Sequence, residues 1–376
     1  MKIYYWSPFT SKVATIKAVI NSAYSLKKSF KYETTIINSF GEWNNYNKQI
    51  KKKKIKLLKK DFNISAKNIN GYFLSRLAYI KIFFYSFFYL KKLLIKEKPK
   101  YLIIHLITSL PIFLFIFFKF DTKLVLRISG LPKLNILRKI LWMLGKNKIC
   151  FITTPTIETL KNLKRKRIFE NKKIYFLPDP VFIKNDIKIK KKKIKYTNYI
   201  LNIGRLTKQK NQEMLISSFK DISKKYKKLK LIILGTGEKY KHLKRLSRNL
   251  KIEKKIIFLG HVMEPYQYIK NALCVCISSL WEDPGFVMIE SAALKKIVIC
   301  SDCKSGPKEF FENGNTGFLF KNNNSKDLIR VFNKFINTEK KQINYKIKKS
   351  YINSLNYSEI EHGKKLNQLL RFYEKK

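Results

Sequence analysis

The feature that most constrains the fold is the alternation of short apolar runs with longer polar stretches in the second half of the chain. The apolar runs are rich in Ile, Leu and Val, and they lie at residues 199–203, 229–237, 256–261, 273–279 and 296–302. Runs of this kind indicate buried strands, and the amphipathic stretches between them indicate helices. Repeated strand–helix units place their strands in a parallel sheet with helices on both faces. We therefore predict an α/β domain in this half.

Two glutamates stand eight positions apart in the segment SSLWEDPGFVMIE, at residues 278–290. Asp283 suits the N-cap of a helix and Pro284 its first position. We therefore predict that Glu282 precedes this helix and that Glu290 lies about two turns into it. The free N–H groups of a helix start can face an anion, and carboxylates accept hydrogen bonds from hydroxyl groups. The spacing suggests a sugar-nucleotide site. The alternative is that both glutamates are solvated surface positions.

Two cations follow a predicted strand in the segment YILNIGRLTKQKNQEMLISSF, at residues 199–219. A turn at Gly204 is followed by Arg205 and Lys210, and then by an amphipathic helix. A planar guanidinium and a mobile ammonium group at such a turn can hold a diphosphate. Because lysine is abundant throughout the chain, a single lysine is weak evidence for a binding site. The prediction therefore rests mainly on Arg205.

In these motifs the C-terminal half resembles the donor domain of glycosyltransferase family 4, also described as glycosyl transferases group 1. The resemblance is carried by G-R-L-x-x-x-K-N at residues 204–211, by the Glu-x7-Glu pair within WEDPGFVMIES, and by S-G-P-x-E at residues 305–309. Members of this family have the GT-B fold, in which two Rossmann-like α/β domains face each other across a cleft. The N-terminal half resembles the family only loosely.

The resemblance implies a retaining, metal-independent transfer of a sugar from a nucleotide-sugar donor to an acceptor hydroxyl, with no cofactor. Arg205 and Lys210 would bind the donor diphosphate, Glu290 the ribose hydroxyls, and Glu282 the donor sugar near the reacting carbon as a catalytic group. The chemistry agrees, because the reaction builds positive charge on the sugar and negative charge on the diphosphate. The implied donor-binding residues are Gly204, Arg205, Lys210, Gly285, Phe286 and Glu290.

The N-terminal half contributes fewer candidates. His105 ends an apolar run, YLIIHLIT, where the family commonly places a histidine near the donor sugar, so the resemblance implies a catalytic role. The alternative is a satisfied core or capping histidine. Lys12 and Arg127 are candidate acceptor contacts. The family often has a glycine-rich loop after its first strand, whereas this chain has SPFTSKVAT, without glycine.

The lysine-rich run after residue 183 and the resemblance to this family together divide the chain into four parts. Residues 1–180 are predicted to form an acceptor-binding Rossmann-like domain and residues 181–197 a lysine-rich linker. Residues 198–356 are predicted to form the donor-binding Rossmann-like domain, and residues 357–376 a helix that packs toward the N-terminal domain.

The 376-residue chain is strongly basic, with 80 Lys and Arg against 25 Asp and Glu and a net charge of +55. Such a charge suits nucleic acid or an anionic membrane surface. The lysines are spread along nearly the whole chain, and no helix-turn-helix, zinc-finger or RNP-like motif accompanies them, so nucleic acid is not an expected partner. Residues 72–96 interleave aromatic residues with lysines. They predict either a helix at a lipid interface or a core helix of the first domain.

The segment MKIYYWSPF lacks the features of a signal peptide. The apolar tract at residues 101–120 is interrupted by His105, Pro111 and Lys119, which favours a strand, a turn and a short helix over a membrane span. We expect a cytoplasmic protein, with peripheral attachment at the inner face of the membrane as a further hypothesis.

Two other kinds of site are disfavoured. Four cysteines form a C-x-C pair at residues 274–276 and a C-x-x-C pair at residues 300–303, both in or beside apolar strands, so we expect buried thiols and no metal. Gly235 and Gly237 begin a G-x-G-x-x-G pattern, but Tyr240 occupies the position of the third glycine. A nicotinamide site is therefore not predicted.

The function predicted from these observations is sugar transfer from a UDP- or GDP-sugar to a saccharide or lipid-linked acceptor, in the synthesis of surface polysaccharide or lipopolysaccharide. Two alternatives stay open. One is a sugar-nucleotide epimerase on the same fold, and the other is a basic nucleic-acid-binding module.

Overall fold

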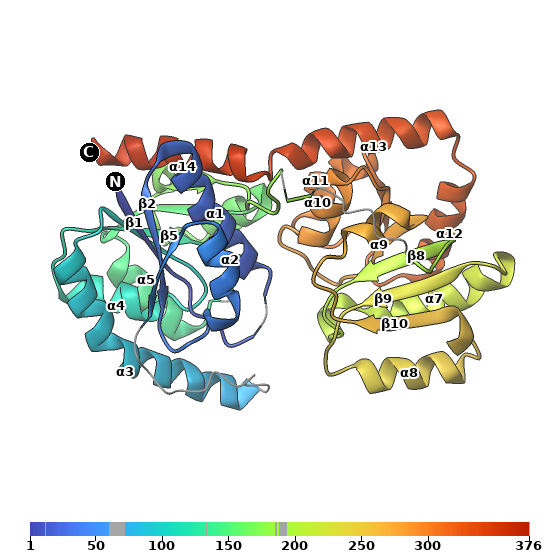
Figure 1. Ribbon diagram of the computed structural model, residues 1–376, viewed down its shortest axis with the longest axis horizontal. Coiled ribbons are helices and arrows are strands. Elements are labelled where there is room, and N and C mark those ends of the chain that lie inside the picture. Colours follow the sequence, from blue (N-terminus) through green and yellow to red (C-terminus); the bar gives the residue numbers. More distant parts are fainter. Residues whose placement is uncertain (12, 60–71, 133, 185, 188–193, 376) are drawn as a thin grey trace. The chain divides into compact units, whose positions relative to one another are not determined.

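The computed structural model describes residues 1–11, 13–59, 72–132, 134–184, 186–187 and 194–375. They form two compact units, the first made of Met1–Val181 with Ser358–Lys376 and the second of Phe182–Tyr357. Each unit is built on one parallel sheet with helices packed on its faces (Figure 1). The predicted α/β fold class is confirmed. The acceptor and donor roles assigned to the two halves stay predictions.

The first unit holds a seven-stranded sheet in the order β3-β2-β1-β4-β5-β6-β7. Its strands are β1 (Lys2–Trp6), β2 (Glu33–Asn38), β3 (Lys56–Lys59), β4 (Tyr101–Ile104), β5 (Lys123–Arg127), β6 (Ile149–Thr154) and β7 (Ile174–Phe176). The strand order reverses at β1, which pairs with β2 on one side and β4 on the other. In open parallel sheets, ligands bind at the carboxyl ends of the strands beside such a switch point.

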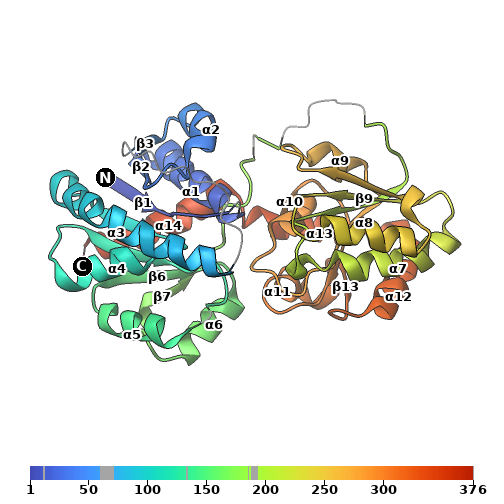
Figure 2. The ribbon, with the colours of Figure 1, turned by 90° about the horizontal axis from the view of Figure 1, so that it is seen from below.

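The helices of the first unit cover both faces of its sheet (Figure 2). They are α1 (Thr15–Phe30), α2 (Asn47–Lys52), α3 (Tyr72–Glu97), α4 (Ser109–Phe117), α5 (Ile136–Gly145), α6 (Ile157–Arg165) and α14 (Glu359–Glu374). Side chains of β1 alternate between two cores. Tyr4 and Trp6 belong to the core with α3 and α4, and Ile3 and Tyr5 to the core with α1 and α14. The C-terminal helix is therefore an integral part of the first unit.

The second unit holds a six-stranded sheet in the order β10-β9-β8-β11-β12-β13, and here the switch point lies between β8 and β11. Its strands are β8 (Tyr199–Ile203), β9 (Lys230–Leu234), β10 (Ile256–Gly260), β11 (Cys274–Ile277), β12 (Val298–Ser301) and β13 (Phe318–Phe320). Its helices are α7 (Gln212–Lys225), α8 (Tyr240–Asn249), α9 (Tyr266–Asn271), α10 (Phe286–Ala293), α11 (Pro307–Phe310), α12 (Ser325–Ile336) and α13 (Lys340–Leu355). The predicted strands in this half all occur.

Residues 72–97 form helix α3, which contributes to the core as one of the two predictions held, and its contact with a lipid interface stays a prediction. Leu90 and Leu94 are buried in the core of the first unit, while Phe84 and Phe88 on the other side are exposed. In the described part of the chain, no helix is both long and apolar enough to cross a membrane. The lysine-rich stretch at residues 188–193 of the predicted linker lies outside the described residues.

Candidate functional site

Two loops meet at the switch point of the second unit. Gly204 begins the loop that follows β8, and Ser278 begins the loop that follows β11. The Leu280 amide donates to the carbonyl of Gln209 at 2.8 Å, and the Ser278 hydroxyl donates to the carbonyl of Lys210 at 2.9 Å. These bonds join the segment with the predicted cations to the segment with Glu282.

The side chains of Lys210 and Glu282 form an ion pair in these loops. The Lys210 Nζ atom lies 2.5 Å from Glu282 Oε1, and their side chains are only 18% and 9% exposed. The Ser279 hydroxyl donates to the same Oε1 at 2.6 Å. A Cβ atom on Gly204 would stand 3.2 Å from Cδ of Lys210, so the glycine leaves room for the lysine stem to cross the turn. Sequence analysis proposed both charges but not their contact.

Arg205 is exposed in the same loop. Its Nη2 donates to Oε1 of Gln209 at 3.3 Å, and Nε2 of Gln209 donates to the carbonyl of Trp281 at 3.0 Å. Arg205 therefore donates to a neutral amide oxygen, which leaves the guanidinium charge available to an anion. Gln209, like Ser279, was not singled out in the sequence, because only the tertiary contact gives it a role.

The helix that carries Glu290 begins later than predicted. Its first residue is Phe286 and not Pro284, and Gly285 is the N-cap with φ of +100°. The prediction that Asp283 caps a helix starting at Pro284 is wrong, because a residue with positive φ cannot continue a right-handed helix. The Asp283–Pro284 peptide is cis. Glu290 is buried and stands in the second turn of α10, still close to its N-terminus.

The turn before α10 rests on the loop that follows β12. Gly306 has φ of +99°, and a Cβ atom there would stand 2.3 Å from the carbonyl oxygen of Pro284. The Ser301 hydroxyl donates to the carbonyl of Ser279 at 2.5 Å. The backbone of the S-G-P-x-E motif therefore packs against the backbone of the Glu-x7-Glu motif.

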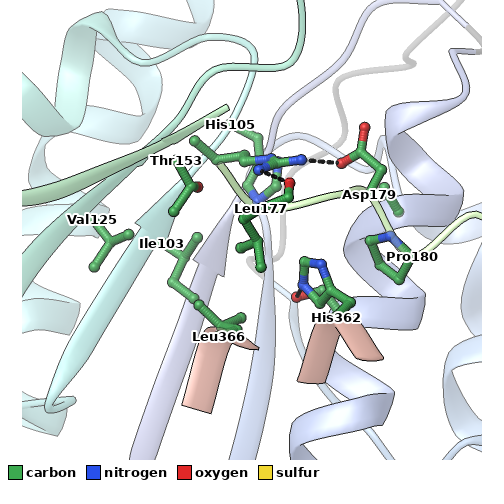
Figure 3. A pocket seen from close by; sticks show the side chains of 12 residues that line it. Ile103, His105, Val125, Thr153, Leu177, Asp179, Pro180, His362 and Leu366 are labelled. Carbon is green, nitrogen blue, oxygen red and sulfur yellow. Dashed lines mark hydrogen bonds and ion pairs between the residues drawn. The ribbon is translucent and has the colours of Figure 1, made fainter. Parts of the chain in front are cut away.

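The first unit contains a second cluster, around a buried cavity of about 10 Å³, which is the space of one water molecule (Figure 3). Its polar lining includes His105, Arg127, Asp179 and His362. His105 follows β4, and its amide donates to the carbonyl of Trp6 at 2.8 Å, which places it at the switch point of this sheet. The structure thus brings together His105 and Arg127, which sequence analysis proposed separately.

Burial, with smaller effects from the Arg127 charge and from His362, holds the pKa of His105 well below its ordinary value. The imidazole is therefore neutral at pH 7. Its Nδ1 atom is buried and has no hydrogen-bond partner within the described part of the chain. A buried, unsatisfied ring nitrogen is uncommon in folded proteins, and it is available to a ligand or a water molecule.

Arg127, a candidate acceptor contact from the sequence, lies in a buried ion pair. Its Nη2 lies 2.6 Å from Oδ1 of Asp179, and its Nη1 donates to the carbonyl of Leu177 at 2.7 Å. Its possible contact with an acceptor stays a prediction, and so does that of Lys12, which lies outside the described residues. Asp179 and His362 were not singled out, because they join the cluster only through the fold.

His105 and Arg127 belong to the first unit, whereas Glu282 and the six donor-binding candidates belong to the second. Four of the five cysteines are buried, and Cys150 is half-buried. Burial raises the pKa of Cys276 to about 12 and that of Cys303 to about 11, so both are neutral thiols at pH 7. Among the described residues, no group of three or more His, Cys, Asp and Glu side chains is placed to hold a metal ion.

Residues 183–350 match the family model of glycosyl transferases group 1. The match spans nearly all of the second unit, Phe182–Tyr357. The match covers the loops with Arg205, Lys210, Glu282 and Glu290, so the candidate site lies within the group 1 domain.

Curated relatives match part of the chain. An uncharacterised glycosyltransferase of Methanocaldococcus jannaschii is 44% identical over 109 residues, 29% of this chain and 27% of the relative. A 4-alpha-N-acetylgalactosaminyltransferase of Campylobacter jejuni, named for a diphospho-undecaprenol-linked substrate, is 33% identical over 150 residues, 40% of each protein. The aligned part of the chain therefore spans well under half of these relatives.

Solved structures match the whole chain. Anabaena HepE in complex with UDP superposes with a TM-score of 0.76 at 15% identity, covering 99% of this chain and 100% of that one. Sucrose-phosphate synthase of Thermosynechococcus elongatus superposes with a TM-score of 0.77 at 12% identity, covering 99% and 98%. At these identities the likeness shows the fold alone. The fold is GT-B, with the group 1 domain as its second Rossmann-like unit.

Proposed function

We propose that this chain is a retaining, metal-independent glycosyltransferase that moves a sugar from a nucleotide-sugar donor to a saccharide acceptor. The observation that carries the proposal is the pairing of Lys210 with Glu282 beside Arg205, in a group 1 domain and at the switch point of its sheet. This arrangement sets cations and a carboxylate next to each other, as the separating charges of the reaction require.

The cations suit the diphosphate of the donor. Arg205 offers a planar fork, and Lys210 keeps two N–H donors beyond the one that Glu282 accepts. Each charge-assisted bond to a phosphate oxygen contributes roughly 1.5–3 kcal/mol. The two side chains supply the positive charge that a divalent cation supplies elsewhere, which supports a metal-independent mechanism.

The carboxylates suit the sugar and the ribose. Glu282 uses Oε1 for both Lys210 and Ser279, so Oε2 remains to accept a hydrogen bond from a donor-sugar hydroxyl. Its negative charge would also favour the positive charge that develops at the anomeric carbon. Glu290, near the N-terminus of α10, would accept bonds from the ribose hydroxyls. We also propose His105 as a catalytic group, as the resemblance to the family implies.

The relatives support the choice of acceptor. Their names include transferases that act on an undecaprenol-diphosphate-linked saccharide, on poly(ribitol-phosphate) and on lipopolysaccharide. We therefore propose a saccharide acceptor, lipid-linked or part of a surface polymer, and a UDP- or GDP-sugar donor. A cytoplasmic enzyme held at the inner face of the membrane would meet both substrates.

The test is a thermal-shift and calorimetric titration of the full chain with UDP, GDP, CMP and dTDP, in magnesium and in EDTA. We expect saturable stabilisation by one nucleotide, with the same affinity in both media. Arg205→Ala should weaken binding about 10- to 100-fold, which corresponds to the loss of one charge-assisted bond. Lys208→Ala removes an exposed charge from the same loop and is the matched control, with unchanged affinity expected.

The chemistry has its own controls. Glu282→Gln should abolish transfer while nucleotide binding persists, and Glu290→Gln should weaken nucleotide binding. The anomeric configuration of the product, read by NMR, decides between retention and inversion. Binding that requires magnesium would contradict the metal-independent mechanism. Release of free nucleotide without an acceptor would favour an epimerase, and tight salt-sensitive binding of RNA or DNA without any nucleotide response would favour a basic binding module.

A further inference from the structure

Helix α5 in the first unit presents an apolar face to solvent. The exposed residues recur at the i, i+1, i+4, i+7 and i+8 positions of one helical face, where a surface helix of a water-soluble protein normally carries polar residues. They are between 48 and 78% exposed, and they are Ile136, Leu137, Ile140, Met143 and Leu144.

The opposite side of α5 is already packed. Trp142 is buried, with its ring centroid 5.3 Å from that of Phe169. Gly145 is also buried and packs tightly against Ile112 of α4. The exposed side chains of α5 therefore do not pack in the core, and a binding partner would explain their apolar character.

The neighbouring helices extend the apolar surface with aromatic rings. Helix α4 contacts both α3 and α5, and α3 and α4 lie side by side in both ribbon views (Figure 2). Phe84 of α3 and Phe117 of α4 are 69% and 62% exposed. Ring contacts connect them through Phe83 and Phe113, with centroid distances of 5.6, 5.5 and 4.6 Å along the series. We call this surface the apolar face, and it consists of Ile80, Phe84, Phe88, Ile95, Phe117, Ile136, Leu137, Ile140, Met143 and Leu144.

The segment that carries the apolar face is basic. Residues 72–148 contain fifteen Lys and Arg but only two acidic residues. Both acidic residues have a lysine partner, since Glu97 lies 3.6 Å from Lys2 and Asp121 lies 2.8 Å from Lys98. On α5 itself, Arg138 and Lys139 are exposed beside the apolar residues. The partner must therefore accept apolar side chains and carry negative charge.

We propose that the apolar face, to which α5 contributes five residues, docks in the headgroup region of an anionic lipid bilayer. A bilayer interface takes apolar side chains into its acyl boundary and attracts the lysines and arginines of the same segment. A protein partner would need an apolar surface ringed by acidic residues. The inference deepens the proposed function and rests on it in one respect, because it would place the first unit, to which we assign the acceptor, where a lipid-linked acceptor resides.

The test measures binding of the full chain to vesicles of phosphatidylcholine, with and without phosphatidylglycerol, over a range of salt concentrations. The wild type should bind the anionic vesicles more tightly than the neutral ones. Ile140→Ser with Leu144→Ser should weaken binding at least about tenfold, because two apolar side chains no longer enter the interface. Met263→Ser, at a residue of the second unit that is 82% exposed, is the matched control and should bind as the wild type does.

A second variant separates charge from apolar contact. Arg138→Gln with Lys139→Gln should weaken binding to anionic vesicles about 25-fold, at roughly fivefold per charge, and should reduce its salt dependence. Binding to neutral vesicles should hardly change. Each variant must keep the wild-type melting temperature, which is expected because its residues are exposed.

Two outcomes would overturn the inference. In the first, the Ile140→Ser, Leu144→Ser variant binds vesicles like the wild type, which would mean that general positive charge carries the interaction. In the second, the wild type does not bind vesicles and forms a dimer, whereas this variant is a monomer. That result would assign the face to a second copy of the chain. The nucleotide response of the second unit is measured separately, so failure of lipid docking and failure of the proposed activity are distinguishable.

Discussion

At the scale of the residue, glycine decides the shape of the turn before α10. Gly306 has positive φ and stands so close to Pro284 that any side chain would meet the Pro284 carbonyl oxygen. Gly260 also has positive φ, at +69°, but has no atom within 4 Å of the place where a Cβ would lie. The two positions therefore share backbone strain and differ in steric contact.

We expect Gly260→Ala to cost about 1 kcal/mol of unfolding free energy, which is the cost of placing alanine at positive φ. Gly306→Ala should cost about 2 kcal/mol more, because the turn before α10 must move away from the new methyl group. Urea unfolding measures both values. Only Gly306→Ala should also weaken nucleotide binding. Equal losses in the two variants would show that the contact with Pro284 does not hold the turn.

At the scale of the element, α14 is held in the first unit by polar and apolar contacts. His362 Nδ1 lies 2.7 Å from the carbonyl of Pro178, and its Nε2 lies 2.8 Å from the Ser22 hydroxyl. Leu366 and Leu370 are buried beneath the helix, and the Tyr101 hydroxyl donates to the Leu370 carbonyl at 2.7 Å. Burial, then the nearby Arg127 charge, lowers the pKa of His362 to about 3.

This docking should weaken as the solution becomes acidic. The folded protein keeps His362 neutral, whereas the unfolded chain takes up a proton below about pH 6.5, so stability is lost as the pH falls from about 6.5 toward 3. The expected loss between pH 7 and pH 4 is about 3 kcal/mol from this residue. His362→Gln should flatten the curve of unfolding free energy against pH. His105 shifts in the same direction and remains in both proteins, so its contribution largely cancels in the difference between their curves, apart from the small effect of His362 on the His105 pKa.

The measurement can use tryptophan fluorescence. Three of the four tryptophans, Trp6, Trp43 and Trp142, are buried in the first unit, so the signal follows the unit that contains α14. Curves for the wild type and for His362→Gln that run parallel from pH 7 to pH 4 would contradict the assigned role of the histidine.

At the scale of the whole molecule, the two units have separate cores. The core of the second unit includes residues 200–335, while the cores of the first unit include Leu366, Leu370 and Tyr373 from the far end of the chain. A chain that stops after Tyr357 loses these three side chains. At roughly 1.5–3 kcal/mol for each, the first unit would lose much of the 5–15 kcal/mol that stabilises a typical domain.

We therefore expect the shortened chain to show an unfolded or strongly destabilised first unit and a folded second unit. Calorimetry should show one transition in place of two, and the nucleotide should still raise the midpoint of that transition. The full chain with Lys364→Ala, at an exposed position of α14, is the control and should match the wild type. Loss of the nucleotide response on truncation would show that the second unit depends on the first.

Much of the fold could be predicted because its signals are local. The apolar runs at residues 199–203 and 229–237 became β8 and β9, since their burial pattern repeats within a few residues. The spacing from Gly204 to Lys210 placed both cations in one loop for the same reason. The start of α10 could not be predicted from caps alone, because the turn at Gly285 is shaped by Gly306, a residue from another loop.

The sequence by itself determined the alternation of strands and helices, the α/β class and the motifs of the candidate site, because hydrogen bonding and hydrophobic periodicity act between near neighbours in the chain. Only the tertiary structure decided which side chains meet. Lys210 and Glu282 stand 72 positions apart, and Arg127 and Asp179 stand 52 apart. Their contacts therefore depend on which strands become neighbours in the folded sheets. The exposed apolar residues of α5 show the same limit, since periodicity reveals an apolar stripe but packing decides whether it faces the core or the solvent.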